Sequence, residues 1–235
     1  MEVGYINLYN MFHLNKGDKN MNPTSKKYIR FIIVSLLLLT SVFHSSLITA
    51  QAKSKVDAGV FHDAMRKLWE DHITYTRLFI VSTFGDLPDQ GATAQRLLQN
   101  QDDIGDAIKP FYGDAAGEQL SALLRDHILI AAEILQAAKN GDTAALNDAI
   151  TRWYANADEI AVFLNSANPK NWPLEEMKAM MREHLDLTLE EAVTYLNGDY
   201  AASIAAYDKV HLQALEMADM LSEGIIKQFP NKFKK

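Results

Sequence analysis

Three histidines, each directly preceded by a carboxylate residue, recur through the chain at similar intervals: His72, His127 and His184. Three neutral imidazoles that converge from three helices can hold Zn²⁺ or another divalent ion, with water or a carboxylate as the fourth ligand. His211 is a fourth candidate ligand. One interpretation of the chain is therefore a metal-binding protein of the three-histidine type, with a divalent metal ion as cofactor and a redox or hydrolytic role.

Each histidine is followed at a fixed distance by a Gly-Asp pair and then by a side-chain amide. The spacing from His to Gly is 13, 14 and 14 residues, and the spacing from Gly to the amide is 15 residues each time. The amides are Asn100, Asn156 and Gln213, and a carboxylate follows each of them three residues later: Asp103, Glu159 and Glu216. A period of 56–57 residues indicates a repeated supersecondary unit.

The segments between these signals have a helical pattern, because apolar residues recur at i, i+3, i+4 and i+7. In each Gly-Asp pair, we expect the glycine to end one helix in the left-handed conformation and the aspartate to cap the start of the next helix. Pro88 is expected in a first turn, residues 110–113 and 165–173 are expected to link hairpins, and Gly224 is expected near the last helix end. The sequence thus predicts an all-α fold, an antiparallel bundle of three αα-hairpin repeats with six helices.

Within each hairpin, the histidine and the amide lie at matching heights, about 20 Å from the turn at 1.5 Å rise per residue. Both positions fall inside apolar stripes, which predicts a buried layer in which amides act as hydrogen-bond partners of imidazoles. The carboxylates Asp103, Glu159 and Glu216 are expected at the rim, in salt bridges. Two readings remain open: the layer only fixes the register of the hairpins, or it lines a pocket that binds a ligand.

Residues 1–52 have the features of a targeting segment. A positive stretch precedes an apolar stretch from Phe31 to Phe43, and Ala50-Gln51-Ala52 fits a signal-peptidase site. We expect cleavage before Lys53 and a true start at Met21; an uncleaved anchor from Phe31 to about residue 48 is the alternative. Residues 53–235 would then form a single helical-bundle domain, secreted or attached to the cell envelope, with no stable membrane span.

Composition excludes several classes of protein. The formal net charge of −7 argues against a nucleic-acid partner, because phosphate binding needs a basic face. The chain has no cysteine, so disulfides, thiolate metal sites and cysteine nucleophiles are excluded. No phosphate-cradling loop or nucleophile elbow is present, so no catalytic residue is assigned. The leading interpretation is a non-catalytic binding or interaction module, whose partner is a small ligand, a metal or a protein.

Several short stretches carry a resemblance to a known family: residues 100–105, residues 156–161, residues 184–188 and Gln228-Phe229-Pro230. They resemble a family of exported, helical bacterial proteins that is common in Bacillus-like organisms, over roughly residues 60–233. A departure is Tyr75-Thr76-Arg77, where the family pattern has Trp-Thr-Arg. The resemblance implies export and an all-helical fold. Some members are labelled glycosyltransferases, but the residues here contain no nucleotide-sugar site.

Overall fold

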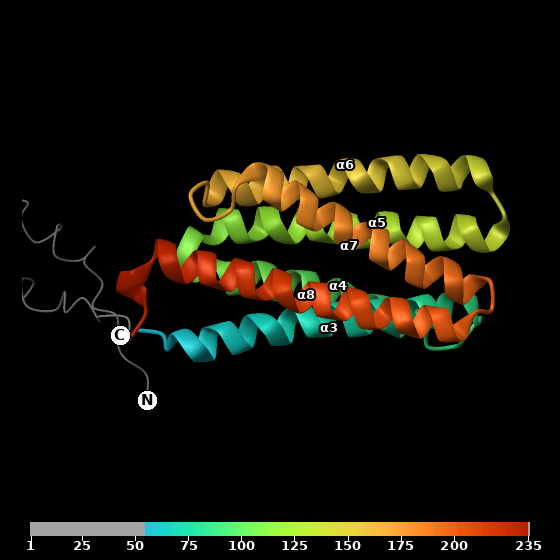
Figure 1. Ribbon diagram of the computed structural model, residues 1–235, viewed down its shortest axis with the longest axis horizontal. Helices are drawn as coiled ribbons and strands as arrows, with labels where there is room; N and C mark the ends of the chain where they lie inside the picture. The colour runs from blue at the N-terminus through green and yellow to red at the C-terminus, as the bar shows by residue number, and fades with distance from the viewer. Residues whose placement is uncertain (1–54, 235) are drawn as a thin grey trace, which may run out of the picture. The chain divides into compact units, whose positions relative to one another are not determined.

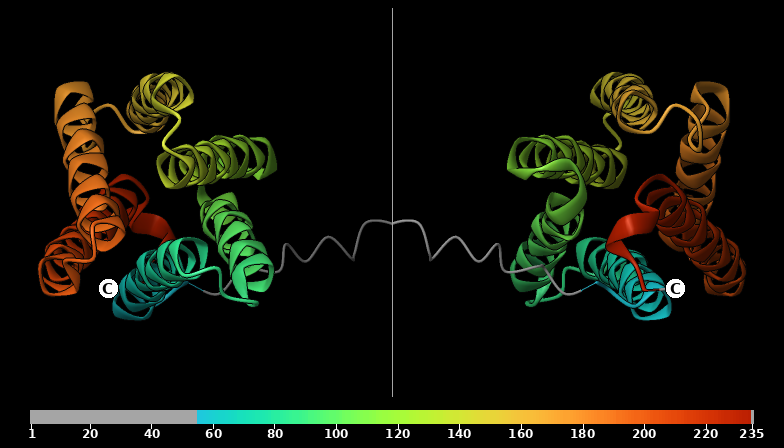
Figure 2. Two further views of the ribbon diagram at one scale, coloured as in Figure 1. Left: turned by 90° about the vertical axis from the view of Figure 1, so that its right-hand side faces the viewer. Right: turned by 90° about the vertical axis from the view of Figure 1, so that its left-hand side faces the viewer.

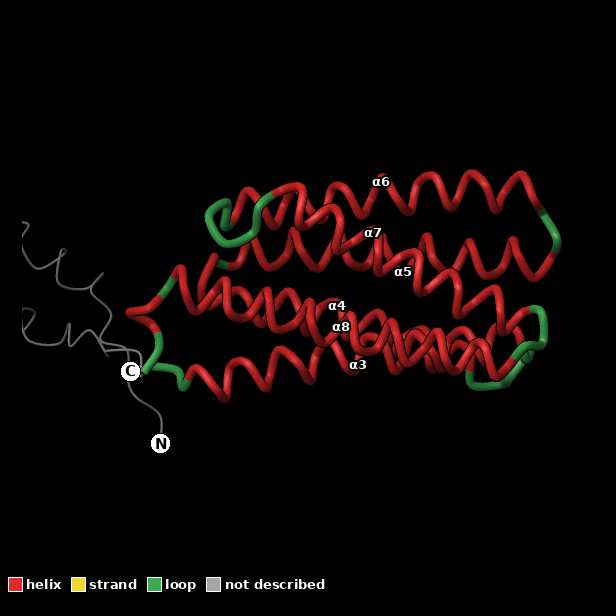
Figure 3. The backbone as a smooth tube through the Cα atoms, in the orientation of Figure 1, coloured by secondary structure: helices red, strands yellow, loops and turns green. Residues whose placement is uncertain are grey.

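The computed structural model describes residues 55–234, which form six long α-helices and one short 3₁₀ helix. The expected targeting segment, with its alternative as an anchor, lies outside the described residues. Figures 1 and 3 show that helix makes up nearly all of the described chain. The helices are α3 (Ala58–Phe84), α4 (Gln90–Tyr112), α5 (Asp114–Asn140), α6 (Thr143–Ala167), α7 (Leu174–Leu196) and α8 (Tyr200–Gln228), followed by η1 (Pro230–Lys232).

The six helices stand in a ring in which each helix packs against its neighbours in sequence and α8 returns to α3 (Figure 2). Successive helices are antiparallel, and the three hairpin turns lie at one end of the bundle (Figure 1). An isolated backbone bridge between Val56 and Phe233 joins the two ends of the described chain, which contains no strand. The predicted all-α antiparallel bundle of six helices is confirmed. None of the described helices is both long and apolar enough to cross a membrane.

Two of the three Gly-Asp turns have the predicted conformation. Gly141 and Gly198 have φ values of +71° and +78°, in the left-handed region that favours glycine. Asp142 and Asp199 then cap the next helix, each accepting a backbone N–H at 3.0 Å. The first turn differs: Gly85 has φ −85° and Asp86 takes the left-handed position at φ 52°. Because this turn is longer and α4 begins at Gln90, the expectation that Pro88 lies in the first helical turn was wrong.

One expected boundary was also wrong. The predicted linker at residues 110–113 is helical up to Tyr112, so that Gly113 alone separates α4 from α5. The helix continues past Pro110 because Phe111 packs in an aromatic cluster, 5.0 Å from Phe61 and 5.4 Å from Phe233 between ring centroids. Gly224 lies inside α8, where a Cβ atom would come within 2.1 Å of Trp172 Nε1. Close packing therefore accounts for that glycine, which does not end a helix.

Helices α4 and α5 approach closely at a pair of glycines. A Cβ atom on Gly105 would lie 2.0 Å from Ser121 Oγ and 2.5 Å from the Gly117 carbonyl oxygen. The same segment of α4 carries Asn100 and Gln101, which are both fully buried. The glycine contact thus sets the distance at which α4 and α5 hold these amides in the core.

We expect Gly105→Ala to destabilise the protein by about 1–3 kcal/mol, because the added methyl group has no space against α5. The matched control is Gly91→Ala, where nothing lies within 4 Å of the added Cβ atom. That change should be neutral or slightly stabilising, since alanine favours helix. Urea denaturation of both variants measures the difference; equal stability of the two would contradict the close approach.

Candidate functional site: the histidine cavity

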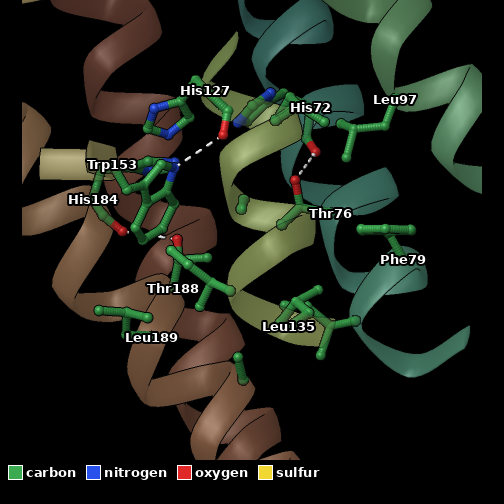
Figure 4. Close-up of a pocket in the computed structure, with 15 residues that line it drawn as sticks. His72, Thr76, Phe79, Leu97, His127, Leu135, Trp153, His184, Thr188 and Leu189 are labelled. Carbon is green, nitrogen blue, oxygen red and sulfur yellow. Dashed lines mark hydrogen bonds between the residues drawn. The ribbon is translucent and has the colours of Figure 1, made fainter. Parts of the chain in front are cut away.

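The three predicted histidines lie in the core, one on each of α3, α5 and α7. His72, His127 and His184 are each 3 % exposed, and the three predicted amides are buried as well: Asn100, Asn156 and Gln213. The three imidazoles gather at one end of a common cavity (Figure 4). The prediction that these three histidines and three amides lie buried in the core is therefore confirmed.

In the second and third hairpins the amide holds the imidazole through its oxygen. Asn156 Nδ2 donates to the Leu123 carbonyl at 3.1 Å, so Asn156 Oδ1 is the atom that faces His127 Nδ1, at 2.8 Å. Gln213 likewise donates to a backbone carbonyl at 3.1 Å and presents Oε1 to His184 Nδ1 at 3.0 Å. Because an amide oxygen only accepts, Nδ1 of both rings carries the proton and Nε2 keeps a free lone pair.

The first hairpin departs from this pattern at one residue. Asn100 Nδ2 donates to the Leu68 carbonyl at 2.9 Å, as its counterparts do, but Gln101 inserts next to His72. Gln101 Nε2 lies 3.3 Å from His72 Nδ1 and 3.2 Å from Asn100 Oδ1. Gln101 Nε2 has two N–H groups and also donates to the Leu97 carbonyl at 2.8 Å, so its contact with His72 does not define which ring nitrogen of His72 carries the proton. Sequence reasoning missed Gln101, although two adjacent amides at 100 and 101 were a visible signal.

The cavity enclosed by these rings has a volume of about 30 Å³. Thr76 and Thr188 also line it, but their hydroxyls donate to the carbonyls of His72 and His184, both at 2.8 Å. The Trp153 ring stacks on His127 at 5.0 Å between centroids. The remaining lining is apolar and includes Phe79, Leu97, Leu135 and Leu189 (Figure 4). A space of this size holds one or two waters or a single ion with a water, and no larger organic ligand.

Burial keeps the three imidazoles neutral. Desolvation is the largest cause that lowers the pKa of all three histidines, and it brings the pKa of His127 to about 3. His72 is lowered further by the neighbouring His184 and His127, because a charge on one ring opposes a charge on the next. Groups that stay neutral through the physiological range are poor general acids, so this arrangement does not suit proton-transfer catalysis near pH 7.

The cavity is not arranged as a ready metal site. Within residues 55–234, no three or more His, Asp or Glu side chains are placed so that they could hold one ion together. The His72 and His184 rings lie 5.7 Å apart between centroids. His211, the fourth candidate, does not line the cavity; it lies 3.6 Å from Glu70 and stacks on Tyr207.

The three predicted rim carboxylates are outside the cavity. Asp103 lies 3.8 Å from Arg96 and accepts a hydrogen bond from Gln99 at 3.1 Å. Glu159 and Glu216 are exposed, and neither has an ion-pair partner within 4 Å among the described residues, so the expected salt bridges form only at Asp103.

Sequence reasoning missed the fully buried Glu191, although it lies seven residues after His184 and so on the same helix face.

We expect His127→Leu to cost about 1–3 kcal/mol of unfolding free energy, because it leaves the Asn156 oxygen buried without a donor. The double variant His127→Leu with Asn156→Leu should recover part of that loss, since both polar partners are removed together. Chemical denaturation of the two single variants and the double variant measures the coupling. Simple addition of the two single costs would contradict a specific His127–Asn156 interaction.

The stability of the metal-free protein should fall as the pH drops below 6.5, the ordinary pKa of histidine. The lowered pKa values mean that the unfolded chain binds more protons than the folded protein below this pH, so each cluster histidine removes about 1.4 kcal/mol per pH unit. Glu191 works in the opposite direction, because its pKa is raised to about 7. Denaturation at several pH values should give a shallower slope for the His127→Leu, Asn156→Leu variant; an unchanged slope would contradict the neutral layer.

Comparison of the chain with protein-family models, with curated proteins and with solved structures gives no match. The resemblance to an exported bacterial family therefore stays a prediction from short stretches of sequence. The function proposed below rests on the chain's own residues and their geometry.

Proposed function

We propose that this chain is a non-catalytic binding protein, that its site is the histidine cavity, and that its ligand is a late first-row transition-metal cation. The observation that carries the proposal is the pair of buried imidazoles, His127 and His184, whose Nδ1 atoms face amide oxygens at 2.8 and 3.0 Å. Neutral imidazole nitrogen is a preferred ligand of zinc, copper and nickel.

The size of the cavity supports an ion over a metabolite. About 30 Å³ accommodates one ion with a bound water, whereas an organic ligand needs several times that space. The lowered pKa values of His127 and His184 also favour metal binding, because the single proton of each neutral ring sits on Nδ1 and the metal does not compete with a proton for Nε2.

The amides could orient the histidines for a metal ion, as hydrogen-bond partners of the ligands do in known metal sites. A ligating histidine nearly always donates its second N–H to an acceptor that fixes the tautomer and the ring orientation. Asn156 and Gln213 do this for His127 and His184, and each amide is itself held by a backbone carbonyl. Two ligands would therefore be oriented before the ion arrives.

Metal binding by all three histidines requires a change at the first hairpin. Binding through His72 Nε2 requires the ring proton on Nδ1, where Asn100 Oδ1 would have to accept it in place of the N–H of Gln101. The cavity lining contains no carboxylate, so a divalent cation would need an anion such as hydroxide beside it. These two requirements favour a cation that carries its own water or hydroxide as the fourth ligand.

A second reading is that the layer only fixes the register of the hairpins. It is favoured by the way the polar groups satisfy one another: the His127 and His184 Nδ1 atoms and their amides have their partners without any ligand. This reading predicts a stable protein that binds no cation.

Calorimetric titration of the untagged protein with Zn²⁺, Co²⁺, Ni²⁺ and Cu²⁺ separates the two readings. We expect one equivalent of at least one cation to bind and to raise the melting temperature. His184→Ala should abolish this binding, whereas His211→Ala, which removes a histidine outside the cavity, should retain it. Absence of binding for every cation, or binding that survives His184→Ala, would contradict the proposal.

A further inference from the structure

The outer face of the α5–α6 hairpin carries a long groove that is open to solvent. Three hollows, with volumes of about 420, 450 and 390 Å³, follow one another along the two helices. Neighbouring hollows share lining residues: Glu159 lines the first two, and Glu133 and Arg152 line the last two. The three hollows therefore form one depression, called the α5–α6 groove below, which is about 30 Å long at 1.5 Å rise per residue.

Each helix presents one straight row of side chains to the α5–α6 groove. On α5 the row has alternating intervals of three and four residues: Leu123, Asp126, Ile130, Glu133, Ala137 and Asn140. On α6 the row has intervals of four and three residues: Asp148, Arg152, Ala155, Glu159, Val162 and Ser166. Rows with this spacing are the surfaces on which a further helix packs in coiled coils and helical bundles.

Apolar side chains form the deeper part of the groove. Four of its more buried lining residues are apolar: Leu123, Ile130, Ala137 and Phe163. Two further aliphatic side chains remain largely in water, since Leu129 is 49 % exposed and Val162 is 51 % exposed. A partner that covered these side chains would gain the free energy of removing apolar surface from water.

The groove is also strongly acidic. Its lining has one basic residue, Arg152, and six carboxylates: Asp126, Glu133, Asp142, Asp148, Asp158 and Glu159. Arg152 is already paired with Glu133 and, at 2.8 Å, with Asp148. Asp126 and Glu159 are exposed and have no ion-pair partner within 4 Å among residues 55–234. Negative charge without a counter-charge therefore lies beside the apolar part of the groove.

Charge and shape together indicate which occupant the groove fits. A second copy of this chain, with its formal net charge of −7, or an anionic membrane would be repelled. An extended peptide would find no backbone partners, because α5 and α6 bond their own backbone groups internally. A helix satisfies its own backbone and presents apolar residues at the matching intervals of three and four.

We propose that the α5–α6 groove binds an amphipathic helix of a partner protein, with aliphatic residues along one face and lysine or arginine on both sides of that face. The aliphatic face covers Leu129, Ile130 and Val162, and the basic residues face Asp126 and Glu159. The bound helix packs as a third helix on the hairpin and is about 20 residues long. The groove lies on the outer face of the bundle, so the proposal does not depend on metal binding in the histidine cavity.

Titration of the ¹⁵N-labelled, metal-free protein with a synthetic peptide tests the groove. The probe is a helical peptide of about three heptads with leucine along one face and lysine beside it. We expect the amide resonances of α5 and α6 that line the groove to shift in ¹H–¹⁵N correlation spectra, while those of α3 and α8 stay in place. A second peptide with glutamate at every lysine position should not bind. Absence of binding by the lysine peptide, shifts spread equally over α3 and α8, or equal binding of the glutamate peptide would overturn the proposal.

Two pairs of surface variants locate the contact. Val162→Lys should weaken binding of the lysine peptide at least about tenfold, because it places a like charge on the apolar row. Leu212→Lys is its matched control, since Leu212 is an aliphatic residue on α8 that is 59 % exposed; it should bind as the wild type does. Glu159→Gln should weaken binding about two- to fivefold, and Glu216→Gln, an exposed carboxylate on α8, should not. Equal affinities of the two members of the first pair would overturn the proposal.

Discussion

A buried imidazole is costly unless its ring nitrogens have partners, and this constraint fixes how the hairpins of this bundle are assembled. In the second and third hairpins, the amide that meets the histidine stands on the opposite helix, and it also donates to the carbonyl four residues before that histidine. Sliding one helix by a turn would break both contacts at once. Apolar packing alone would allow such a slip far more readily, since helix stripes of leucine and alanine match in several registers.

The constraint on the histidines also determines what the cavity can do. Amide oxygens on Nδ1 leave the Nε2 lone pairs of His127 and His184 free, and burial keeps the rings unprotonated. The result is a small, mostly apolar space with three neutral imidazoles at one end, whose lowered pKa values do not suit proton transfer at neutral pH. Gln101 lies beside His72 and makes the first hairpin differ from the other two.

Much of this arrangement could be predicted from the sequence, because helix rise and turn chemistry are local properties. Equal spacing about Gly141 and Gly198 was enough to place His127 opposite Asn156 and His184 opposite Gln213. The features that the sequence did not predict depend on contacts between residues far apart along the chain. Helix α4 continues past Pro110 because Phe111 packs against residues far away in sequence, and no local signal reports that contact. The pairing of Glu191 with Arg77 depends on how α3 meets α7, which hairpin spacing does not determine.

The central claim is that three neutral imidazoles share one cavity in the core, and that amide oxygens define the tautomers of His127 and His184. Long-range ¹H–¹⁵N correlation spectra of the histidine rings, recorded on the metal-free protein at pH 7, report protonation and tautomer for each ring. The account predicts the Nδ1–H tautomer for His127 and His184, and no imidazolium among the three histidines. A protonated ring at any of these positions, or Nε2–H at His127 or His184, would contradict it.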